Sequence, residues 1–246
     1  VLSVVGCQKL ELSSDDVEYR QSEEGELLLY EIGEEEPFEG IIVDEYDNGH
    51  TNCKIEFKDG LRDGNFTFWR ENEIPLLKGR YRKGKRHGLF VAYGKAGEKV
   101  YEKQYADDKL NGPCRFYYPY SDDDVEDYFS KMKNEGLEPS ELKANSKLRY
   151  FCEFLDDAPK GRYEVFYHKS EEVNSTQELL REHGHFDANG SLFREQVFYF
   201  PEVDKLSIKL PTGEMLDEGF DANEKGLSRA IESAYIAIEE LPAYRN

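Results

Sequence analysis

Apolar and polar residues alternate through much of the chain, which is the pattern of β-strands that lie in a sheet. Between residues 65 and 93 the alternation sorts the side chains into two sets. On one face fall Phe66, Phe68, Leu77, Gly79, Tyr81, Phe90 and Ala92. On the opposite face fall Thr67, Trp69, Lys78, Arg80, Val91 and Tyr93. Both faces carry aromatic residues, so the pattern predicts a sheet that cross-strand aromatic contacts stabilise.

A glycine recurs every 24 residues between these predicted strands, at Gly40, Gly64, Gly88 and Gly112. An aromatic residue stands seven positions before each of the last three glycines: Phe57, Tyr81 and Tyr105. The pairs Asn48-Gly49 and Asp59-Gly60 are strong signals for two-residue hairpin turns. A fixed period with aligned aromatic residues is typical of repeat proteins. The sequence therefore predicts an antiparallel β-meander with two strands in each 24-residue unit.

The period breaks after Gly112 and resumes near Phe154, which again stands seven positions before a glycine, Gly161. Residues 121–147 are polar, and the run Asp122-Asp123-Asp124 is typical of a helix N-terminus. We expect a helical or mobile insertion there.

A different pattern marks the last part of the chain, where apolar residues follow the spacing of one helix face. They are Leu227, Ala230, Ile231, Ala234, Tyr235, Ile238 and Leu241. Pro242 ends the stripe, which predicts a C-terminal amphipathic helix over Leu227–Leu241 that packs on the sheet.

The predicted fold class is mainly β: an elongated antiparallel β-meander of 24-residue hairpin repeats, with a helical insertion and a C-terminal amphipathic helix. The expected segments are a signal remnant and tether, the repeat array, the insertion, further β-hairpins and the C-terminal helix. Their bounds are 1–16, 17–120, 121–147, 148–220 and 221–246.

The composition favours a folded protein with an acidic surface. Aromatic residues make up 13% of the 246 residues, which is more than disordered chains carry. The formal net charge is −20, and such a field repels phosphate groups, so we expect no nucleic-acid partner. The charge favours a basic protein partner, or it serves solubility alone.

The first residues, Val1 to Gly6, are small and apolar, and a polar stretch follows Cys7. The run Val4-Val5-Gly6-Cys7 resembles the lipobox of bacterial lipoproteins, in which an aliphatic, any and a small residue precede the lipid-bearing cysteine. The resemblance implies a lipid anchor on Cys7 and a place in the bacterial cell envelope. Gln8 follows rather than the aspartate that retains enteric-type lipoproteins at the inner membrane, so we expect the outer membrane, facing the periplasm. The alternative is a buried first strand that ends in an ordinary cysteine.

Three stretches, residues 30–40, 44–49 and 57–60, read acidic-Pro-Phe-any-Gly, then aromatic-any-Asn-Gly, then aromatic-Lys-any-Gly. This succession resembles the variant MORN repeat of bacterial proteins named YwqK-type antitoxins, over Val17 to Tyr118 and more loosely over Leu148 to Tyr167. Members of that family include solitary lipoproteins, array scaffolds and proteins encoded beside secreted toxins. Glu73 and Ser121 depart from the pattern, because they stand where it has a turn glycine.

The repeat also predicts which residues face each other. We take the Asn48-Gly49 turn as the centre of one hairpin and repeat that centre every 24 residues. Phe66 then lies opposite Gly79, and Phe90 lies opposite Lys103. The same frame places Cys114 opposite Cys152, with the insertion looped out between them. In an oxidising envelope these two cysteines are expected to form a disulfide, which leaves Cys53 as a lone thiol. The alternative is two separate buried thiols.

No catalytic motif stands out, because the chain has no phosphate loop and no nucleophile elbow. His183 and His185 share a strand face without a third ligand at usable spacing, so we expect no metal and no cofactor. The expected function is a non-enzymatic, lipid-anchored repeat protein that binds a protein partner, in its sharper form as an antitoxin or immunity protein. The alternative is a glycan-binding lipoprotein that stacks sugars on the row Trp69, Tyr93 and Tyr117, although such a row is also ordinary cross-strand packing.

Overall fold

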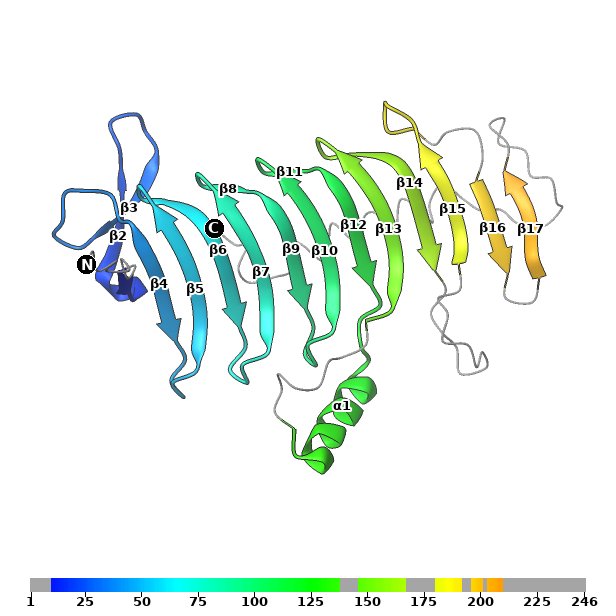
Figure 1. The fold of residues 1–246 in the computed structure, drawn as a ribbon, viewed down its shortest axis with the longest axis horizontal. Coiled ribbons are helices and arrows are strands. Elements are labelled where there is room, and N and C mark those ends of the chain that lie inside the picture. The colour runs from blue at the N-terminus through cyan, green and yellow to red at the C-terminus, as the bar shows by residue number, and fades with distance from the viewer. Residues whose placement is uncertain (1–9, 138–145, 167–179, 192–195, 201–202, 210–246) are drawn as a thin grey trace, which may run out of the picture. The chain divides into compact units, whose positions relative to one another are not determined.

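The computed structural model describes residues 10–137, 146–166, 180–191, 196–200 and 203–209 (Figure 1). The protein is mainly β, as the alternation predicts, and it forms two compact units. The first comprises Val1–Gly112 with Pro119–Ser146, and the second comprises Pro113–Tyr118 with Lys147–Asn246. Cys7 and the predicted helix over Leu227–Leu241 lie outside the described residues.

The first unit is a sheet whose strands follow one another in meander order. Its strands are β1 (Glu11–Leu12), β2 (Val17–Gln21), β3 (Leu27–Glu31), β4 (Gly40–Glu45), β5 (Thr51–Lys58), β6 (Leu61–Trp69), β7 (Pro75–Arg82), β8 (Lys85–Arg86), β9 (Gly88–Tyr93), β10 (Lys99–Ala106) and β11 (Lys109–Leu110). Within this unit the sheet order is β1-β4-β5-β6-β7-β9-β10, with β8 on β7 and β11 on β10. β2 and β3 form a separate two-stranded sheet.

Strand β1 pairs in parallel with β4, so that Leu12 faces Ile42. A short 3₁₀ helix over Ser14–Asp16 follows it, capped by the Ser13 side chain. Leu12 also packs on the small apolar cluster around Leu29. The fold therefore takes in residues from Glu11 onward, although the sequence assigns residues 1–16 to a tether. A two-residue strand without a turn signal gives no pattern from which to predict it.

The hairpin register is the one that the spacing predicts. Gly40 faces Phe57 across β4 and β5, Phe66 faces Gly79 across β6 and β7, and Phe90 faces Lys103 across β9 and β10. The register prediction is therefore confirmed for these three hairpins.

Tight turns with two residues at positive φ connect consecutive strands of this sheet along the edge formed by one end of the strands. This is the backbone of type I′ hairpin turns, which match the twist of the strands that they join. The turn residues and their φ angles are Asp59 (50°), Gly60 (73°), Lys83 (49°), Gly84 (77°), Asp107 (50°) and Asp108 (74°). We call this the tight-turn edge.

Longer turns join the strands at their other ends, and each has one residue at positive φ. These residues are Gly49 (φ 82°), Glu73 (φ 61°) and Gly97 (φ 79°). Glu73 thus adopts the left-handed backbone of the glycine that it replaces. We call this the groove edge, for the feature described below.

Stacked aromatic rings form the core between the two edges. The Phe66 ring lies 5.2 Å from the Phe90 ring, which lies 5.0 Å from the Tyr105 ring (centroid distances). Phe90 is completely buried. A Cβ on Gly79 would lie 2.7 Å from the Phe66 ring and 2.9 Å from the Phe90 ring, so the absence of a side chain there lets the two rings meet.

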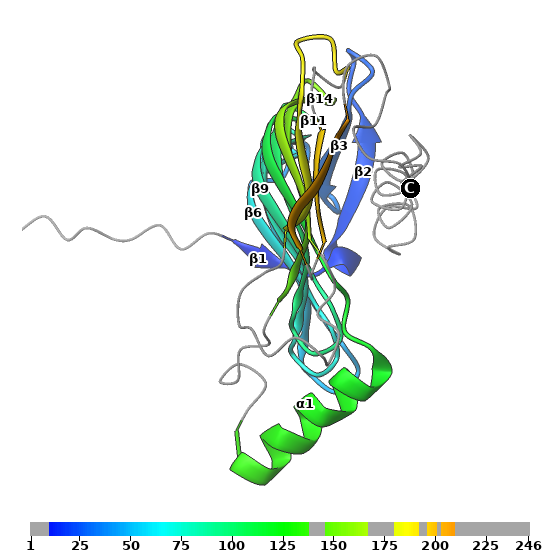
Figure 2. The same cartoon turned by 90° about the vertical axis from the view of Figure 1, so that its right-hand side faces the viewer.

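The insertion forms the helix α1 (Asp122–Glu135), which confirms the predicted helix start. The Ser121 side chain caps the Asp124 backbone N–H, and the Asp124 carboxylate caps Ser121 in return, which is a capping box. The helix buries Tyr128 and Met132 against Ala96, in the turn between β9 and β10. Figure 2 shows α1 beyond one end of the strands of this unit.

The second unit continues with β12 (Gly112–Tyr117), β13 (Leu148–Leu155), β14 (Ala158–Phe166), β15 (Leu180–Phe186), β16 (Gln196–Phe200) and β17 (Val203–Lys209). These strands also pair in sequence order. The turn between β13 and β14 again has two residues at positive φ, Asp156 (50°) and Asp157 (68°).

Candidate binding groove

An open groove of about 500 Å³ lies at the groove edge, between the turns of the sheet and α1. This volume is within the range of small-ligand and peptide side-chain pockets. Its apolar lining is Tyr46, Trp69, Leu76, Val125 and Phe129. Its polar lining is Arg70, Glu71, Asn72 and Lys95. All of these residues belong to the first unit, and the two from α1 supply one wall.

The turn that carries Trp69 is held from the neighbouring turn. The Tyr46 hydroxyl donates to the Trp69 carbonyl at 2.6 Å, and the Asn48 side chain donates to the Glu71 carbonyl at 3.2 Å. His50 Nδ1 lies 2.7 Å from the same carbonyl, and because a carbonyl can only accept, the bound tautomer has its proton on Nδ1. These bonds fix the backbone under the aromatic side chains before any ligand arrives.

Arg70 brings a positive charge to the groove. Its Nη2 donates to the Tyr93 carbonyl at 3.1 Å, and its Nε is shielded from solvent without a hydrogen-bond partner. Within the described part of the chain no carboxylate forms an ion pair with Arg70. The guanidinium is therefore held by a backbone carbonyl and, among the described residues, has no ion pair.

Lys95 and α1 form the far side of the groove. Lys95 Nζ lies 3.4 Å from Asp122 Oδ1, but both side chains are exposed, so this ion pair contributes little. The helix is held instead by the burial of Tyr128 and Met132. The turn under it is braced from within, because the buried Glu98 carboxylate accepts from the Ala96 backbone N–H at 3.0 Å.

The members of the predicted aromatic row lie on β6, β9 and β12, and the row itself stays a prediction. Trp69 lines the groove, whereas the Tyr93 ring lies 5.8 Å below the Lys78 ammonium, and burial raises the pKa of Tyr93. Tyr117 belongs to β12 of the second unit. Among the described residues no ring contact joins Trp69 to Tyr93.

The sequence did not point to Tyr46 or Arg70 as groove residues. A signal for both was nevertheless present, since the insertion begins at Ser121, in the same column of the 24-residue period as Gly49, Glu73 and Gly97. An insertion in that column must leave the sheet at the same edge as the turns that hold Tyr46 and Arg70.

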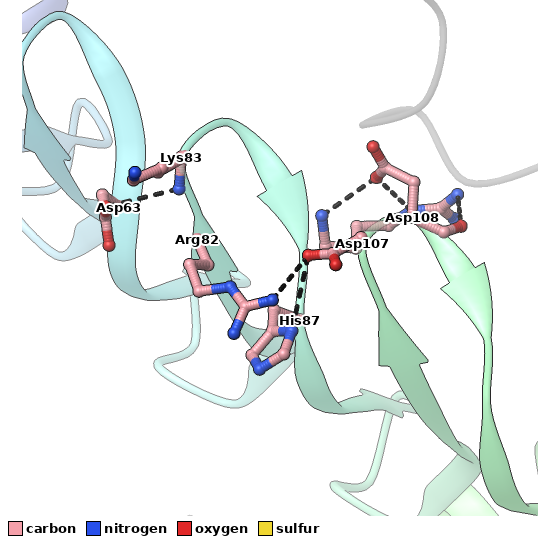
Figure 3. Close-up of polar contacts among 7 residues, drawn as sticks. Asp63, Arg82, Lys83, His87, Asp107 and Asp108 are labelled. Carbon is pink, nitrogen blue, oxygen red and sulfur yellow. Dashed lines mark hydrogen bonds and ion pairs between the residues drawn. The ribbon is translucent and has the colours of Figure 1, made fainter.

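Charged side chains link successive turns along the tight-turn edge (Figure 3). The Arg82 guanidinium donates to Asp107 at 2.8 Å, and the Asp63 carboxylate accepts from the Lys83 backbone N–H at 3.3 Å. Arg86 donates to Asp108 through its backbone N–H at 2.9 Å and through Nε at 3.1 Å. The hydrogen bond from Arg82 is the first cause that holds the pKa of Asp107 below its usual value. At this edge Arg82 and Arg86 thus each pair with an aspartate of the next turn.

Cys114 and Cys152 lie on the adjacent strands β12 and β13 and are both fully buried. In the structure Cys152 is a thiol. Burial raises the pKa of this thiol to about 12, and the neighbouring Cys114 contributes to the rise. The adjacency of the two strands agrees with the predicted frame, while the disulfide itself stays a prediction. Burial and the nearby Asp44 carboxylate raise the pKa of the Cys53 thiol to about 11.

Within the described ranges, no group of three or more His, Cys, Asp or Glu side chains is placed to hold a metal ion. No helix in that same part of the chain has the length and apolar character needed to cross a membrane. The comparisons with known proteins assign no family, because no family model matches the chain and no curated protein matches it. The resemblance to the MORN-type repeat therefore stays a prediction from the residues.

Proposed function

We propose that this protein is a non-enzymatic binding protein of the bacterial envelope, built from 24-residue β-hairpin repeats of the MORN or YwqK type. In this proposal a lipid on Cys7 anchors it, more specifically to the outer membrane facing the periplasm. Its sharper form is an antitoxin or immunity protein that occupies a partner toxin.

The observation that carries the binding function is the groove with Tyr46, Trp69 and Arg70 on its walls. Tyrosine, tryptophan and arginine are enriched among the residues that dominate the binding energy of protein interfaces. The net charge of −20 supports a basic partner, because opposite charge speeds the encounter.

Capture from native cells tests this function. The tagged, full-length protein is expressed in its own host, and envelope extracts are passed over it at low and at high salt. We expect one enriched protein with a basic surface, whose association rate with the purified chain falls as salt screens the charges beyond about 10 Å at 0.1 M. An association rate that does not respond to salt would show that the acidic surface does not steer the partner.

Fractionation tests the anchor. Two or three acyl chains would hold the protein at the membrane, at about 0.8 kcal/mol for each buried CH₂ group. We expect wild-type protein in the membrane fraction and Cys7→Ser protein in the soluble fraction. A Cys7→Ser protein that stays with the membranes would refute lipid attachment at this residue.

An envelope location also supports the disulfide between Cys114 and Cys152, because that compartment is oxidising. The bridge would stabilise the fold by about 4 kcal/mol in the chain-entropy model, since the closed loop is long. Mass spectrometry of unreduced, envelope-derived protein is expected to show the Cys114–Cys152 peptide pair and a free Cys53. Free thiols at both positions would exclude the bridge.

A second candidate is binding of a glycan. Trp69 stands beside the polar side chains of Glu71 and Asn72 in the groove, and an aromatic face next to hydrogen-bonding groups is suited to a sugar ring. An array of envelope oligosaccharides separates the two candidates, because only this second function predicts binding to isolated glycans.

A further inference from the structure

We propose that the groove binds a peptide segment of the otherwise basic partner in which an apolar side chain, aromatic or aliphatic, stands next to an acidic residue. This inference rests on the proposed protein-binding function and names the site and the chemistry of the segment. The apolar side chain would lie between Trp69 and α1, and the carboxylate would meet Arg70.

The apolar side chains on the two walls of the groove favour an apolar side chain in the bound segment. Trp69 is the last residue of β6 and Tyr46 lies in the turn after β4, while Val125 and Phe129 come from α1 on the other side. Val125 and Phe129 are only partly buried, although they pack on the cluster that docks the helix. A side chain that enters between the two walls would remove their remaining apolar surface from water, which is favourable in proportion to its area.

Arg70 sets the acidic part. The Nε atom is already shielded from solvent, so the terminal nitrogens are the donors that an incoming group meets. One of them is held by the Tyr93 carbonyl, which fixes the orientation of the guanidinium. Its planar N–H groups suit a carboxylate better than any neutral acceptor, because charge-assisted hydrogen bonds are stronger. A fixed cation that has no ion pair among the described residues and lies beside an apolar wall therefore favours an acidic residue next to an apolar one.

The turn beside these groups holds the backbone of Arg70 in place. The Glu73 N–H donates to the Arg70 carbonyl at 2.9 Å, which closes the turn after Trp69 and Arg70.

Trp69 makes the test direct, because it is the single tryptophan of the chain. Its fluorescence therefore reports on this groove alone. The full chain is titrated with the peptide Ac-Ala-Phe-Glu-Ala-NH₂ and with its neutral match, Ac-Ala-Phe-Gln-Ala-NH₂, neither of which contains tryptophan. We expect a saturable fluorescence change with both peptides, and an affinity about tenfold higher for the acidic one.

Two groove variants and one control variant test the roles of Arg70 and Phe129. Arg70→Gln is expected to lower the affinity for the acidic peptide about tenfold, to that of the neutral peptide. Phe129→Ala is expected to weaken both peptides alike. Arg82→Gln removes the same charge at the tight-turn edge and is expected to change neither affinity. Circular dichroism melting of each variant shows whether the fold is intact.

Equal affinities for the two peptides, an equal loss in Arg70→Gln and Arg82→Gln, or no saturable response of Trp69 would overturn the assignment. A Trp69 response to envelope oligosaccharides with none to the peptides would overturn it in favour of the glycan. If the peptides fail while envelope extract still yields a partner, the groove assignment fails and the protein-binding function stands. If the peptides bind as expected while no partner is captured, the groove stands and the proposed function fails.

Discussion

The two edges of the first unit are made from the same repeating strands, yet they differ in chemistry. At the tight-turn edge, two-residue turns recur, and charged side chains bond from one turn to the next, as Arg82 does to Asp107. At the groove edge, longer turns meet the inserted helix α1, and Arg70 has no ion pair among the described residues. At the first edge two arginines pair with aspartates of the next turn, whereas the groove has Arg70 and three aromatic side chains in its lining.

Under the proposed function, this difference indicates how one end of a meander sheet can gain a binding groove. At a regular edge the polar side chains of one turn bond to the next turn. Few of these side chains therefore remain for a ligand. A single insertion into one turn breaks that regularity and adds a wall that the repeat cannot supply. We therefore propose that binding belongs to the edge where the period is broken, whereas at the edge where it is kept the side chains link one turn to the next.

The largest expected effect comes from the core that both edges share. Phe90→Ala should reduce the free energy of unfolding by about 3–5 kcal/mol, because Phe90 is fully buried and stacks on Phe66 and Tyr105. Its neighbour in the chain, Leu89, is 48% exposed, and Leu89→Ala should change stability by less than about 1 kcal/mol. Chemical denaturation of the two variants measures this. Equal losses would mean that the aromatic stack is not the common core of the edges.

The next effect separates the edges. Met132→Ala should release α1 from Ala96, with a loss of about 2 kcal/mol or more, since Met132 is buried in the helix contact. The emission of Trp69 should shift to longer wavelength as its groove opens to water, while the tight-turn edge is unchanged. The exposed neighbour Lys131 is the control, because Lys131→Ala leaves the contact in place. Unchanged Trp69 emission in Met132→Ala would show that α1 is not a wall of the groove.

A smaller effect tests the strain at the groove edge. Glu73→Gly should stabilise the protein by about 0.5–1 kcal/mol. Glycine removes the strain of the left-handed backbone, and this gain exceeds the cost of the extra entropy that glycine has in the unfolded chain. Gly97→Ala, at the equivalent turn, should destabilise it by a similar amount. Thermal melting of both variants measures the pair. If Glu73→Gly lowers the melting temperature, the glutamate has a contact that outweighs the strain.

The smallest effect belongs to the tight-turn edge and depends on pH. The pKa of Asp107 is lowered, first by the hydrogen bond from Arg82. The stabilisation from a lowered carboxyl pKa is present above the ordinary pKa and is lost as the pH falls through the folded value. Asp107→Asn should therefore lower the melting temperature slightly at neutral pH and not at strongly acidic pH. A deficit that persists in acid would mean that the side chain acts through something other than its charge.

Much of the fold could be predicted because it depends on local signals with a fixed period. The Asp59-Gly60 turn determines its own backbone, and the turns then set the register that brings Phe90 opposite Lys103. The acidic run Asp122-Asp123-Asp124 likewise marks the start of α1, which begins at Asp122.

The groove could not be predicted in the same way, because it depends on contacts between distant residues. Alternation assigned Trp69 to the face of Thr67, but the register shifts between Phe68 and Trp69, and beyond such an irregularity alternation no longer gives the direction of a side chain. The docking of Met132 on Ala96 depends on shape and burial rather than on any motif. Sequence reasoning therefore named Trp69 without the neighbours that give it a role.

Site-specific photo-crosslinking in the native host tests most directly whether the groove edge is the binding edge. A photo-reactive phenylalanine analogue is placed either at Leu76, in the groove, or at Lys83, in a tight turn, and the cells are irradiated. The account predicts a discrete protein adduct from position 76 that disappears when Arg70→Gln is added, and none from position 83. An adduct from position 83 with none from position 76 would contradict it.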